Sequence, residues 1–282
     1  MATEMHLWEA VLLGAIEGFT EFLPVSSTGH LTITEKLMGY SIDDPDITAF
    51  TAIIQSGAVL ATVIYLRGDL ICLLRAFFAG VGSSSARRER DFRFALFVLA
   101  GSIPIGIVGL TFKDEIETTL RSLWFVGGAL ILFSGVMWWA DRVGTQRRHE
   151  GDITLRDTIT IGIAQCLALI PGVSRSGATM STGLLLGIDR VAVTKLSFFL
   201  AIPALVGATI LQTVSEFDNI ANGVGWAPTI TATVVSFVVG YAAVAWLLKF
   251  IAHHGLGIFI AYRLALGSLV LILVATNTIS AT

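Results

Sequence analysis

Six long apolar segments constrain this chain more than any other feature of its sequence. An α-helix needs about 20 mostly apolar residues to cross the hydrocarbon core of a bilayer. Inside that core, only helices and closed barrels satisfy every backbone polar group. We therefore predict an all-α polytopic membrane protein with six transmembrane helices. The six segments are residues 47–66, 94–112, 123–140, 196–214, 227–248 and 256–276.

The charge content excludes several other classes of protein. Only 14% of the 282 residues are charged, whereas soluble globular domains have about 25%. A net charge of −3 provides no basic surface for nucleic acid. Two cysteines are too few for a disulfide scaffold or a cysteine metal cluster. The N-terminal apolar stretch contains carboxylates and no basic region before it, so we do not expect a cleaved signal peptide.

Two further apolar regions do not have the pattern of ordinary spans. Each consists of a short apolar segment that ends at a proline, Pro24 or Pro171, then a turn rich in Ser, Thr and Gly, then a second short apolar segment. Irregular backbone at membrane depth is stable only where protein or a water-filled cavity covers it. This pattern predicts two re-entrant helical hairpins. The paired segments are residues 7–23 with 31–39, and residues 158–171 with 178–188.

The distribution of basic residues predicts the orientation. Fourteen of the 18 Lys and Arg residues fall in residues 67–93, 141–157, 187–195 and 249–263. Segments enriched in Lys and Arg stay in the cytoplasm. With hairpins that do not cross the membrane, both termini are then expected to be extracytoplasmic.

Several polar positions receive no catalytic role. Residues 70–81 predict an interfacial helix. We expect Arg263, in the last apolar segment, to extend to the cytoplasmic face, and His149, His253 and His254 to be solvated. Three features interrupt spans and either serve packing and helix bending or line a cavity: Gln55-Ser56-Gly57, Ser102-Ile-Pro104 and Pro203.

The two halves of the chain show a short internal repeat with an offset of 148 residues. The pairs that match at this offset include Gly14 with Gly162 and Ser26 with Ser174. Each half contains one hairpin and three spans, so the second half enters the membrane from the opposite face. We predict a single membrane domain, residues 1–282, made of inverted-topology halves at approximately 1–141 and 142–282. Inverted repeats place their broken helices together near the membrane midplane, where the site is found.

The first hairpin carries an unusual group of polar residues. Glu17 and Glu21 are four residues apart and share a helix face. Each costs about 2.5–3.5 kcal/mol at the membrane centre on insertion scales. A divalent cation, a shared proton or a buried base would offset that cost, and oxygen ligands favour Mg²⁺ or Ca²⁺. The alternative is a carboxylate pair that is simply hydrated.

Three hydroxyls and a histidine follow these carboxylates. His30 lies three residues after Ser27, and a neutral histidine beside a serine hydroxyl is a common activation pair. Ser26, Ser27 and Thr28 are each a candidate nucleophile or ligand. Ser27 or Thr28 could equally cap the next helix, and His30 could be structural.

The second hairpin contributes a cation, Arg175. A guanidinium suits phosphate because its planar fork donates two parallel hydrogen bonds. Glycines and serines around it allow backbone N–H groups to converge on an anion. The alternative is that Arg175 only pairs with Glu17 or Glu21 for stability. The residues of this turn that we assign to anion binding are Gly172, Ser174, Arg175, Ser176, Gly177 and Thr179.

The two motifs together closely resemble those of the undecaprenyl-diphosphate phosphatases of the bacitracin-resistance type. The motifs are Glu17-x-x-x-Glu21 with Pro24-Val-Ser-Ser-Thr-Gly-His30, and Pro171-Gly-x-Ser-Arg-Ser-Gly-x-Thr179. The resemblance implies a hydrolase that converts undecaprenyl diphosphate to undecaprenyl phosphate and inorganic phosphate. It also implies recycling of the lipid carrier for peptidoglycan synthesis, bacitracin resistance, and a need for a divalent cation. The implied location is the bacterial plasma membrane, with the active site open to its outer face.

The resemblance also implies roles for individual residues. Glu17 and Glu21 would hold the metal, Ser27 would attack the terminal phosphorus, and His30 would be the general base. Arg175 would bind the diphosphate. The sequence leaves open whether Ser27 or a water activated by His30 attacks. Residues that would assist Arg175 are Ser26, Thr28, Gly172, Ser174, Ser176, Gly177 and Thr179.

Two other functions fit parts of the pattern. Inverted repeats with broken helices are also typical of transporters, so a lipid-phosphate transporter or flippase is the main alternative. A third possibility is a binder that confers antibiotic resistance without turnover. In each case the partners are a polyprenyl lipid and the lipids of the bilayer. The sequence does not decide between a monomer and a homodimer.

Overall fold

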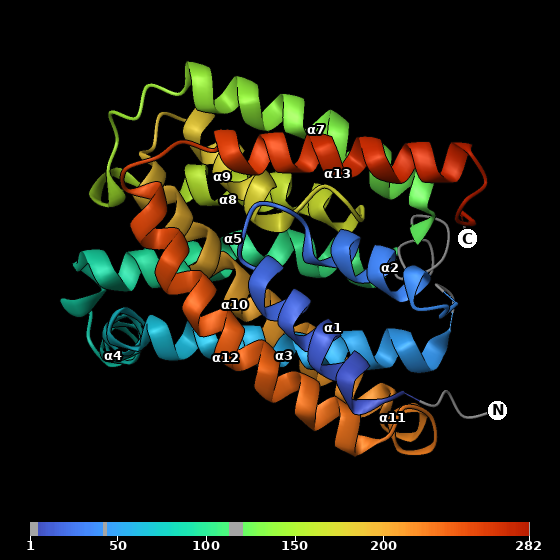
Figure 1. The fold of residues 1–282 in the computed structure, drawn as a ribbon. Coiled ribbons are helices and arrows are strands. Elements are labelled where there is room, and N and C mark those ends of the chain that lie inside the picture. The colour runs from blue at the N-terminus through green and yellow to red at the C-terminus, as the bar shows by residue number, and fades with distance from the viewer. Residues whose placement is uncertain (1–4, 42–43, 113–120, 282) are drawn as a thin grey trace.

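The computed structural model describes residues 5–41, 44–112 and 121–281, and this part of the chain is helical (Figure 1). Six of its helices are long and apolar enough to cross a membrane. Each coincides with one predicted segment to within a few residues, which confirms the six candidate spans. They are α3 (Pro45–Tyr65), α5 (Arg90–Thr111), α7 (Leu123–Val143), α10 (Arg190–Ser215), α12 (Trp226–Ile251) and α13 (Gly257–Ala275).

Two pairs of shorter helices occupy the predicted hairpin regions. The first pair is α1 (Leu7–Thr20) and α2 (Ser27–Leu37), and the second is α8 (Leu155–Gln165) and α9 (Arg175–Leu185), preceded by the 3₁₀ turn η4 (Cys166–Leu169). The two turns have matching local structure. Ser26 and Ser174 both adopt a positive φ, 75° and 77°, and each caps the helix that follows by accepting a hydrogen bond from a backbone N–H. A positive φ is uncommon for a residue with a side chain.

Two glycines bring the short helices very close to long ones. A Cβ on Gly14 of α1 would lie 2.3 Å from the carbonyl oxygen of Ala232 in α12. A Cβ on Gly162 of α8 would lie 2.0 Å from the carbonyl oxygen of Gly101 in α5. Small residues permit such close approach of membrane helices. The first short helix of each half is therefore packed on a long helix of the other half.

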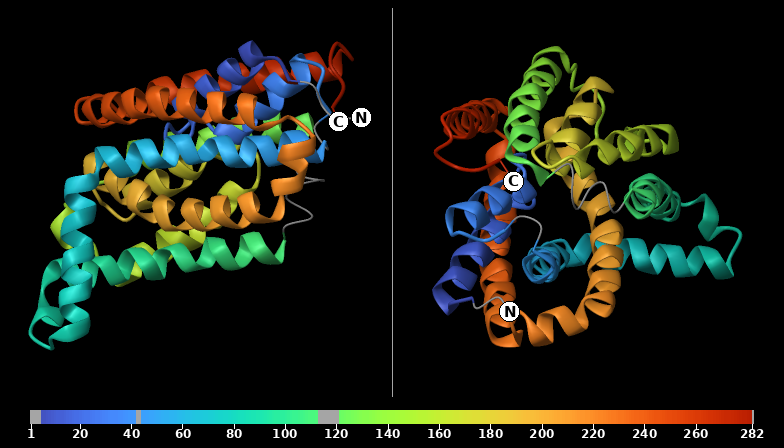
Figure 2. Two further views of the ribbon diagram at one scale, coloured as in Figure 1. Left: turned by 90° about the horizontal axis from the view of Figure 1, so that it is seen from below. Right: turned by 90° about the vertical axis from the view of Figure 1, so that its right-hand side faces the viewer.

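The connections at the two ends of the molecule differ in charge. The four basic segments lie at one end, on the left in Figure 1, whereas α1 begins and α13 ends at the other. At the basic end, α4 (Arg67–Gly82) runs across the direction of α3 and α5 (Figure 2). The helix includes residues 70–81, the predicted interfacial segment. Gly80 is its one buried residue. Three short helices complete the described connections: η1 (Ala86–Arg88), η3 (Glu150–Asp152) and α11 (Phe217–Asn222).

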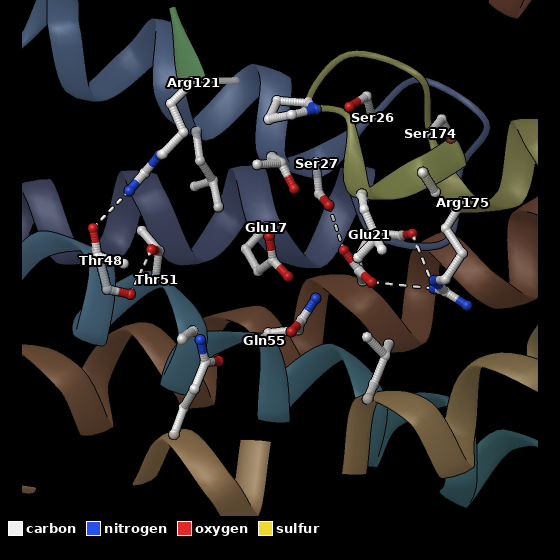
Figure 3. A pocket seen from close by; sticks show the side chains of 18 of the residues that line it. Glu17, Glu21, Ser26, Ser27, Thr48, Thr51, Gln55, Arg121, Ser174 and Arg175 are labelled. Carbon is white, nitrogen blue, oxygen red and sulfur yellow. Dashed lines mark hydrogen bonds and ion pairs between the residues drawn. The ribbon is translucent and has the colours of Figure 1, made fainter. Parts of the chain in front are cut away.

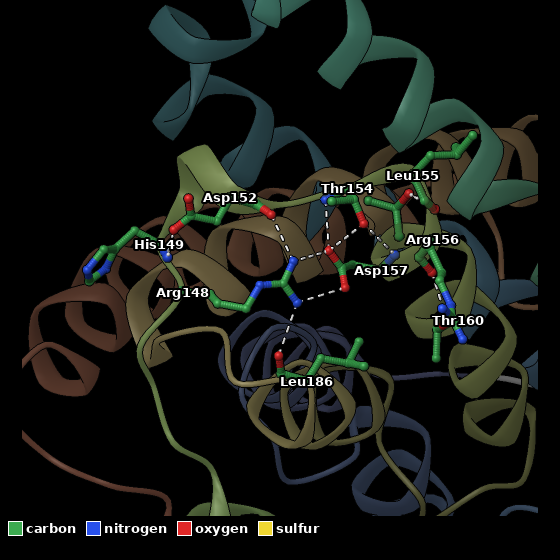
Figure 4. A network of polar contacts seen from close by, with 10 residues as sticks. Arg148, His149, Asp152, Thr154, Leu155, Arg156, Asp157, Thr160 and Leu186 are labelled. Carbon is green, nitrogen blue, oxygen red and sulfur yellow. Dashed lines mark hydrogen bonds and ion pairs between the residues drawn. The ribbon is translucent and has the colours of Figure 1, made fainter.

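An ion pair at the basic end ties the second hairpin together (Figure 4). Arg148 forms two hydrogen bonds with the carboxylate of Asp157, in the first turn of α8. The same guanidinium donates to the carbonyl oxygen of Leu186, which follows α9, at 3.1 Å. Thr154 N–H donates to Asp157 at 2.8 Å. One guanidinium therefore joins the start of α8 to the end of α9.

We expect Asp157→Asn to lower the free energy of unfolding by about 2 kcal/mol, the scale of hydrogen bonds to a charged group. Burial alone would raise the pKa of Asp157, but hydrogen bonds from Arg148 and Thr154 outweigh it and lower the pKa. The stabilisation is therefore present above the unfolded-state pKa of about 3.9 and is lost as the pH falls through the lower, folded-state value. Thermal unfolding in detergent from pH 2 to 7 measures the loss of stability and its dependence on pH. Arg156→Gln changes an exposed neighbour and should leave both the stability and its pH dependence unchanged. An unchanged Tm for Asp157→Asn would contradict a stabilising role of this ion pair.

Candidate functional site

The two hairpin turns enclose one pocket, which we call the hairpin pocket (Figure 3). Its volume is about 290 Å³. Long helices complete its wall, chiefly α3 and α10. The polar and turn residues that the hairpins contribute are Glu17, Glu21, Ser26, Ser27, Thr28, Pro171, Ser174 and Arg175.

Glu21 connects the nucleophile candidate to the arginine of the other hairpin. The Ser27 hydroxyl donates a hydrogen bond to Oε2 of Glu21. Arg175 Nη2 donates to Oε1 of the same carboxylate at 3.1 Å. All three side chains are buried, and the Arg175 guanidinium lies 5.0 Å from the centroid of the Phe22 ring. A carboxylate in this position can accept the serine proton while the guanidinium limits the negative charge around it.

Glu17 lines the same pocket with unused hydrogen-bonding capacity. The residue is 1% exposed, and within the described part of the chain its Oε1 has no hydrogen-bond partner. In Figure 3 its carboxylate lies beside Ser27 and faces Gln55 of α3. Buried polar atoms without a partner are rare and call for an explanation. A proton or a bound cation would supply one.

One hydrogen bond of Ser26 joins the two turns, and two others cap the helices that follow them. The Ser26 hydroxyl oxygen accepts from Gly29 N–H at 3.3 Å and from Gly172 N–H at 3.1 Å. Ser174 accepts from Gly177 N–H at 3.1 Å in the equivalent way. Ser26 is thus both a helix cap and a contact between hairpins. These bonds fix the wall of the pocket that holds Ser27 and Arg175.

Arg263 is a further contact between the turns, and the expectation that it reaches the cytoplasmic face is wrong. Its side chain is completely buried. It donates to the carbonyl oxygens of Gly172 at 2.8 Å and Pro24 at 3.4 Å, and to the Ser134 hydroxyl at 3.1 Å. The turn carbonyls satisfy the guanidinium inside the protein, so it has no reason to extend to water. The signal that could have identified it is the presence of a charge within an apolar span, which is functional by default.

His30 lies away from the hairpin pocket. Its Nδ1 is 2.7 Å from the carbonyl oxygen of Ser26, and its Nε2 is 2.7 Å from the Tyr262 hydroxyl. The two rings stack, and both border a separate apolar cavity of about 560 Å³ beside α12 and α13. The structure therefore brings Glu21, and not His30, to the Ser27 hydroxyl. His149, His253 and His254 are exposed or at the surface, as expected.

The predicted anion-binding residues divide into two groups. Thr28, Ser26, Ser174 and Arg175 line the pocket. The others support the second turn and do not line the pocket. Thr179, for example, donates to the Arg175 carbonyl oxygen at 2.9 Å. This second group is Gly172, Ser176, Gly177 and Thr179.

Several lining residues come from outside the two motifs. Gln55 belongs to the cavity, one of the two alternatives for that position, whereas Ser102 donates to the Leu200 carbonyl oxygen at 3.0 Å and so serves packing. The sequence pattern gave no indication that Arg121, Thr48 and Thr51 would line the pocket. They belong to neither hairpin motif, and Arg121 is distant from both in the sequence, so only the tertiary fold reveals them.

Comparisons with known proteins agree with these motifs. A family model described as "Bacitracin resistance protein BacA" matches residues 10–269. The chain is 68% identical to "Undecaprenyl-diphosphatase 3" of Frankia casuarinae, with 99% of this chain and 100% of that protein aligned. It is 50% identical to "Undecaprenyl-diphosphatase 1" of Streptomyces coelicolor, with 98% of each chain aligned. It is 49% identical to "Undecaprenyl-diphosphatase" of Cutibacterium acnes, with 98% of this chain and 100% of that protein aligned. The chain therefore belongs to the bacitracin resistance protein BacA family.

Proposed function

We propose that this chain is a membrane-embedded phosphatase that hydrolyses undecaprenyl diphosphate to undecaprenyl phosphate and inorganic phosphate. The relatives that match nearly its full length carry the name of that activity. The observation that carries the proposal is the contact of Ser27 and Arg175 with one carboxylate, Glu21, inside a pocket between the hairpins. The product is the lipid carrier of peptidoglycan synthesis in its reusable form. Removal of the diphosphate, which bacitracin sequesters, gives resistance to that antibiotic.

The contacts support a two-step mechanism. The Ser27 oxygen attacks the terminal phosphorus while Glu21 accepts the hydroxyl proton. The bond from that phosphorus to the bridging oxygen breaks, and undecaprenyl phosphate leaves with the proton that Glu21 returns. Water then attacks the phosphoserine while Glu21 accepts a proton from it, and the Ser27 oxygen takes that proton as the phosphorus–oxygen bond breaks, which releases inorganic phosphate and restores the Ser27 hydroxyl. Arg175 stabilises charge on the phosphoryl oxygens, and its Nη1 is buried without a hydrogen-bond partner in the described structure. Phosphoryl transfer depends mostly on such positioning and charge stabilisation.

The carboxylates of the pocket suit a magnesium ion. Among the described residues, no three or more His, Cys, Asp or Glu side chains gather as a metal site, so a cation bound to the two glutamates would take its other ligands from water or phosphate. Mg²⁺ commonly binds one or two carboxylates together with water and substrate phosphates. Glu17, with its unpartnered Oε1, and Glu21 would hold it. When bound, the ion would neutralise charge on the phosphates.

We expect a chelator to reduce phosphate release by the purified protein to background, because the dianionic phosphate group would then face two carboxylates. Added Mg²⁺ should restore the activity, and Ca²⁺ should restore it less well. Phosphate release from undecaprenyl diphosphate in detergent micelles or nanodiscs measures this effect. Glu17→Gln should need a higher Mg²⁺ concentration for activity to recover, or its activity should not recover at all. Full activity after chelation would contradict the metal role of both glutamates.

Two features support the inverted repeat and the re-entrant hairpins. At about 1.5 Å per residue, α1 and α8, with 14 and 11 residues, are shorter than the roughly 30 Å hydrocarbon core. The reciprocal packing of α1 on α12 and α8 on α5 also fits two halves of opposite topology. Gly14 and Gly162, which permit these contacts, are separated by the repeat offset. These points favour one domain in which both hairpins enter the membrane and meet inside it.

The orientation follows from the same arrangement. The pocket includes Thr48, near the start of α3, and Gln212, near the end of α10, so it lies toward the end away from the basic segments. With those segments in the cytoplasm, the pocket opens to the outer face of the plasma membrane and both termini are extracytoplasmic. In a background without Cys72 and Cys166, an impermeant thiol reagent on whole cells should label Ser215→Cys. It should not label Ser85→Cys, and the reverse pattern would overturn this orientation.

Phosphate release also separates the enzyme from its alternatives. Purified protein should release phosphate from undecaprenyl diphosphate, and Glu21→Ala should not. A transporter would move lipid phosphate across liposomes without releasing phosphate. A resistance binder would protect cells from bacitracin without turnover. Phosphate release by the wild-type protein that Glu21→Ala abolishes is the expected result.

A further inference from the structure

A second buried arginine borders the hairpin pocket. Arg121, just before α7, lines the pocket together with Thr48 and Thr51. Its Nη2 lies 3.4 Å from Oε2 of Glu35 in α2, and the two side chains are 8% and 0% exposed. Its Nη1 donates to the Thr48 hydroxyl at 2.6 Å. The chain thus places a guanidinium and a hydroxyl at one wall of the pocket, with a buried carboxylate beside the guanidinium.

This pair leaves much of its hydrogen-bonding capacity unused. A guanidinium has five N–H donors and commonly binds a carboxylate through two of them. Here the contact is single and long, and within the described residues neither Arg121 Nε nor Glu35 Oε1 has a partner. An ion pair that served stability alone would be expected to satisfy more of its atoms, because unsatisfied buried polar groups are costly. The arrangement is better explained by a ligand that shares Arg121 with Glu35.

The position of Arg121 indicates what that ligand is. In Figure 3, Ser27 and Glu17 lie between Arg121 and Arg175. Each of the two arginines already contacts one glutamate. The reaction proposed above produces inorganic phosphate next to Ser27, in the pocket that Arg121 also lines. A guanidinium with free donors matches the oxygens of a phosphate group. The Thr48 hydroxyl, which accepts from Arg121, keeps its own proton for a further acceptor.

We propose that Arg121 forms a second phosphate-binding position in the hairpin pocket, assisted by the Thr48 hydroxyl, and that Glu35 competes with phosphate for it. The proposal rests on the proposed function, because the phosphatase reaction supplies the anion. The bound group is a phosphate, either the inorganic product or the terminal phosphate of the lipid. The competing carboxylate keeps the position weak, so that phosphate is released and not retained.

The test uses two variants with opposite expected effects. Arg121→Gln removes the cation and should raise the inhibition constant of inorganic phosphate at least about tenfold. Glu35→Gln removes the competing charge with little change in shape and should lower the same constant several-fold. Both constants are measured with the purified protein as the inhibition of hydrolysis by added inorganic phosphate. Because added phosphate would mask released phosphate, the rate is followed through a coloured or labelled lipid product. Arg142→Gln, an exposed arginine at the other end of α7, should leave the constant unchanged.

The KM for undecaprenyl diphosphate identifies the source of the bound phosphate. If Arg121→Gln raises KM in parallel with the inhibition constant, the position also holds the substrate. If KM stays unchanged, the position holds the product. Unchanged inhibition constants in both variants, with only a loss of Tm, would show a structural ion pair and overturn the proposal. If Arg121→Gln does not fold, Glu35→Gln decides, because an unchanged or raised constant contradicts the competition.

A binding measurement keeps this proposal separate from the proposed function. Inorganic phosphate should raise the Tm of the wild-type protein, since a ligand of the native state stabilises it. That shift should shrink in Arg121→Gln and grow in Glu35→Gln, whether or not the protein hydrolyses lipid. If the wild-type protein shows these Tm shifts but no turnover, the phosphatase proposal is wrong and the anion-binding position stands. If it shows turnover but not these Tm shifts, the anion-binding position is wrong and the phosphatase proposal stands.

Discussion

Ser27→Ala abolishes phosphate release from undecaprenyl diphosphate, with an expected loss of about 10³-fold or more in kcat, the scale seen when a nucleophile is removed. The substitution deletes one hydroxyl from the pocket. It leaves the hydrogen bond between Glu21 and Arg175 in place, so the fold and the site charge should be retained. Phosphate release and thermal unfolding, measured on the same sample, separate loss of chemistry from loss of structure.

Ser181→Ala is the matched control for this variant. Ser181 is also buried, belongs to α9 and does not line the hairpin pocket, so its loss should leave phosphate release near the wild-type rate. If Ser27→Ala keeps a substantial rate, water and not Ser27 attacks the phosphorus. That result would transfer the role of Glu21 from the serine proton to the proton of the attacking water.

Arg175→Lys lowers kcat by about 10²-fold, the scale expected when one charge-stabilising donor is lost from an active site. Lysine keeps the positive charge but cannot donate to Glu21 and to a phosphoryl oxygen through one planar fork. The shorter reach of its donors also weakens the bond that joins the two hairpins. We expect kcat to fall more than KM rises, because the lost contacts are strongest with the charge of the transition state. Steady-state kinetics on the lipid substrate measure both constants.

Lys195→Arg provides a control for the exchange of the two residue types. Lys195 lies at the basic end and pairs there with Asp69 and Glu150 at the surface, so its exchange for arginine should not change either constant. Near wild-type kcat in Arg175→Lys would contradict the bidentate role and leave Arg175 as a structural partner of Glu21.

The parts of the fold that were predictable from the sequence are those encoded locally. Apolar length defines a span without reference to any other residue, so all six candidate spans coincide with helices such as α3 and α12. The helix that restarts after the first turn is also a local feature, but its cap is Ser26 and not Ser27 or Thr28, the two candidates from the sequence. The capping bonds of Ser26 and Ser174 reach only three residues along the chain. The meeting of Glu21 and Arg175 required one further step, the repeat, which relates two turns that are distant in the sequence.

The residues that sequence reasoning missed depend on contacts between distant segments. Arg121 reaches Glu35 across 86 positions and Arg263 reaches Gly172 across 91, and no periodicity encodes such pairs. The orientation of the His30 side chain also depends on a contact with a distant segment. Its position on α2 turns the imidazole toward Tyr262 of α13, and the spacing from Ser27 alone does not indicate which face of the helix borders the pocket.

The contacts of Arg263 restrict how the two hairpins can move. One guanidinium holds carbonyl oxygens from both turns, so separating the turns would leave a charge inside the membrane without its acceptors. Loss of one partner of a buried charge typically costs about 3–5 kcal/mol. Transporters work by rocking one repeat against the other around the substrate, and that motion would pull these turns apart. The arrangement instead favours a rigid hairpin pocket. The lipid headgroup would enter it and leave it on the same side of the bilayer.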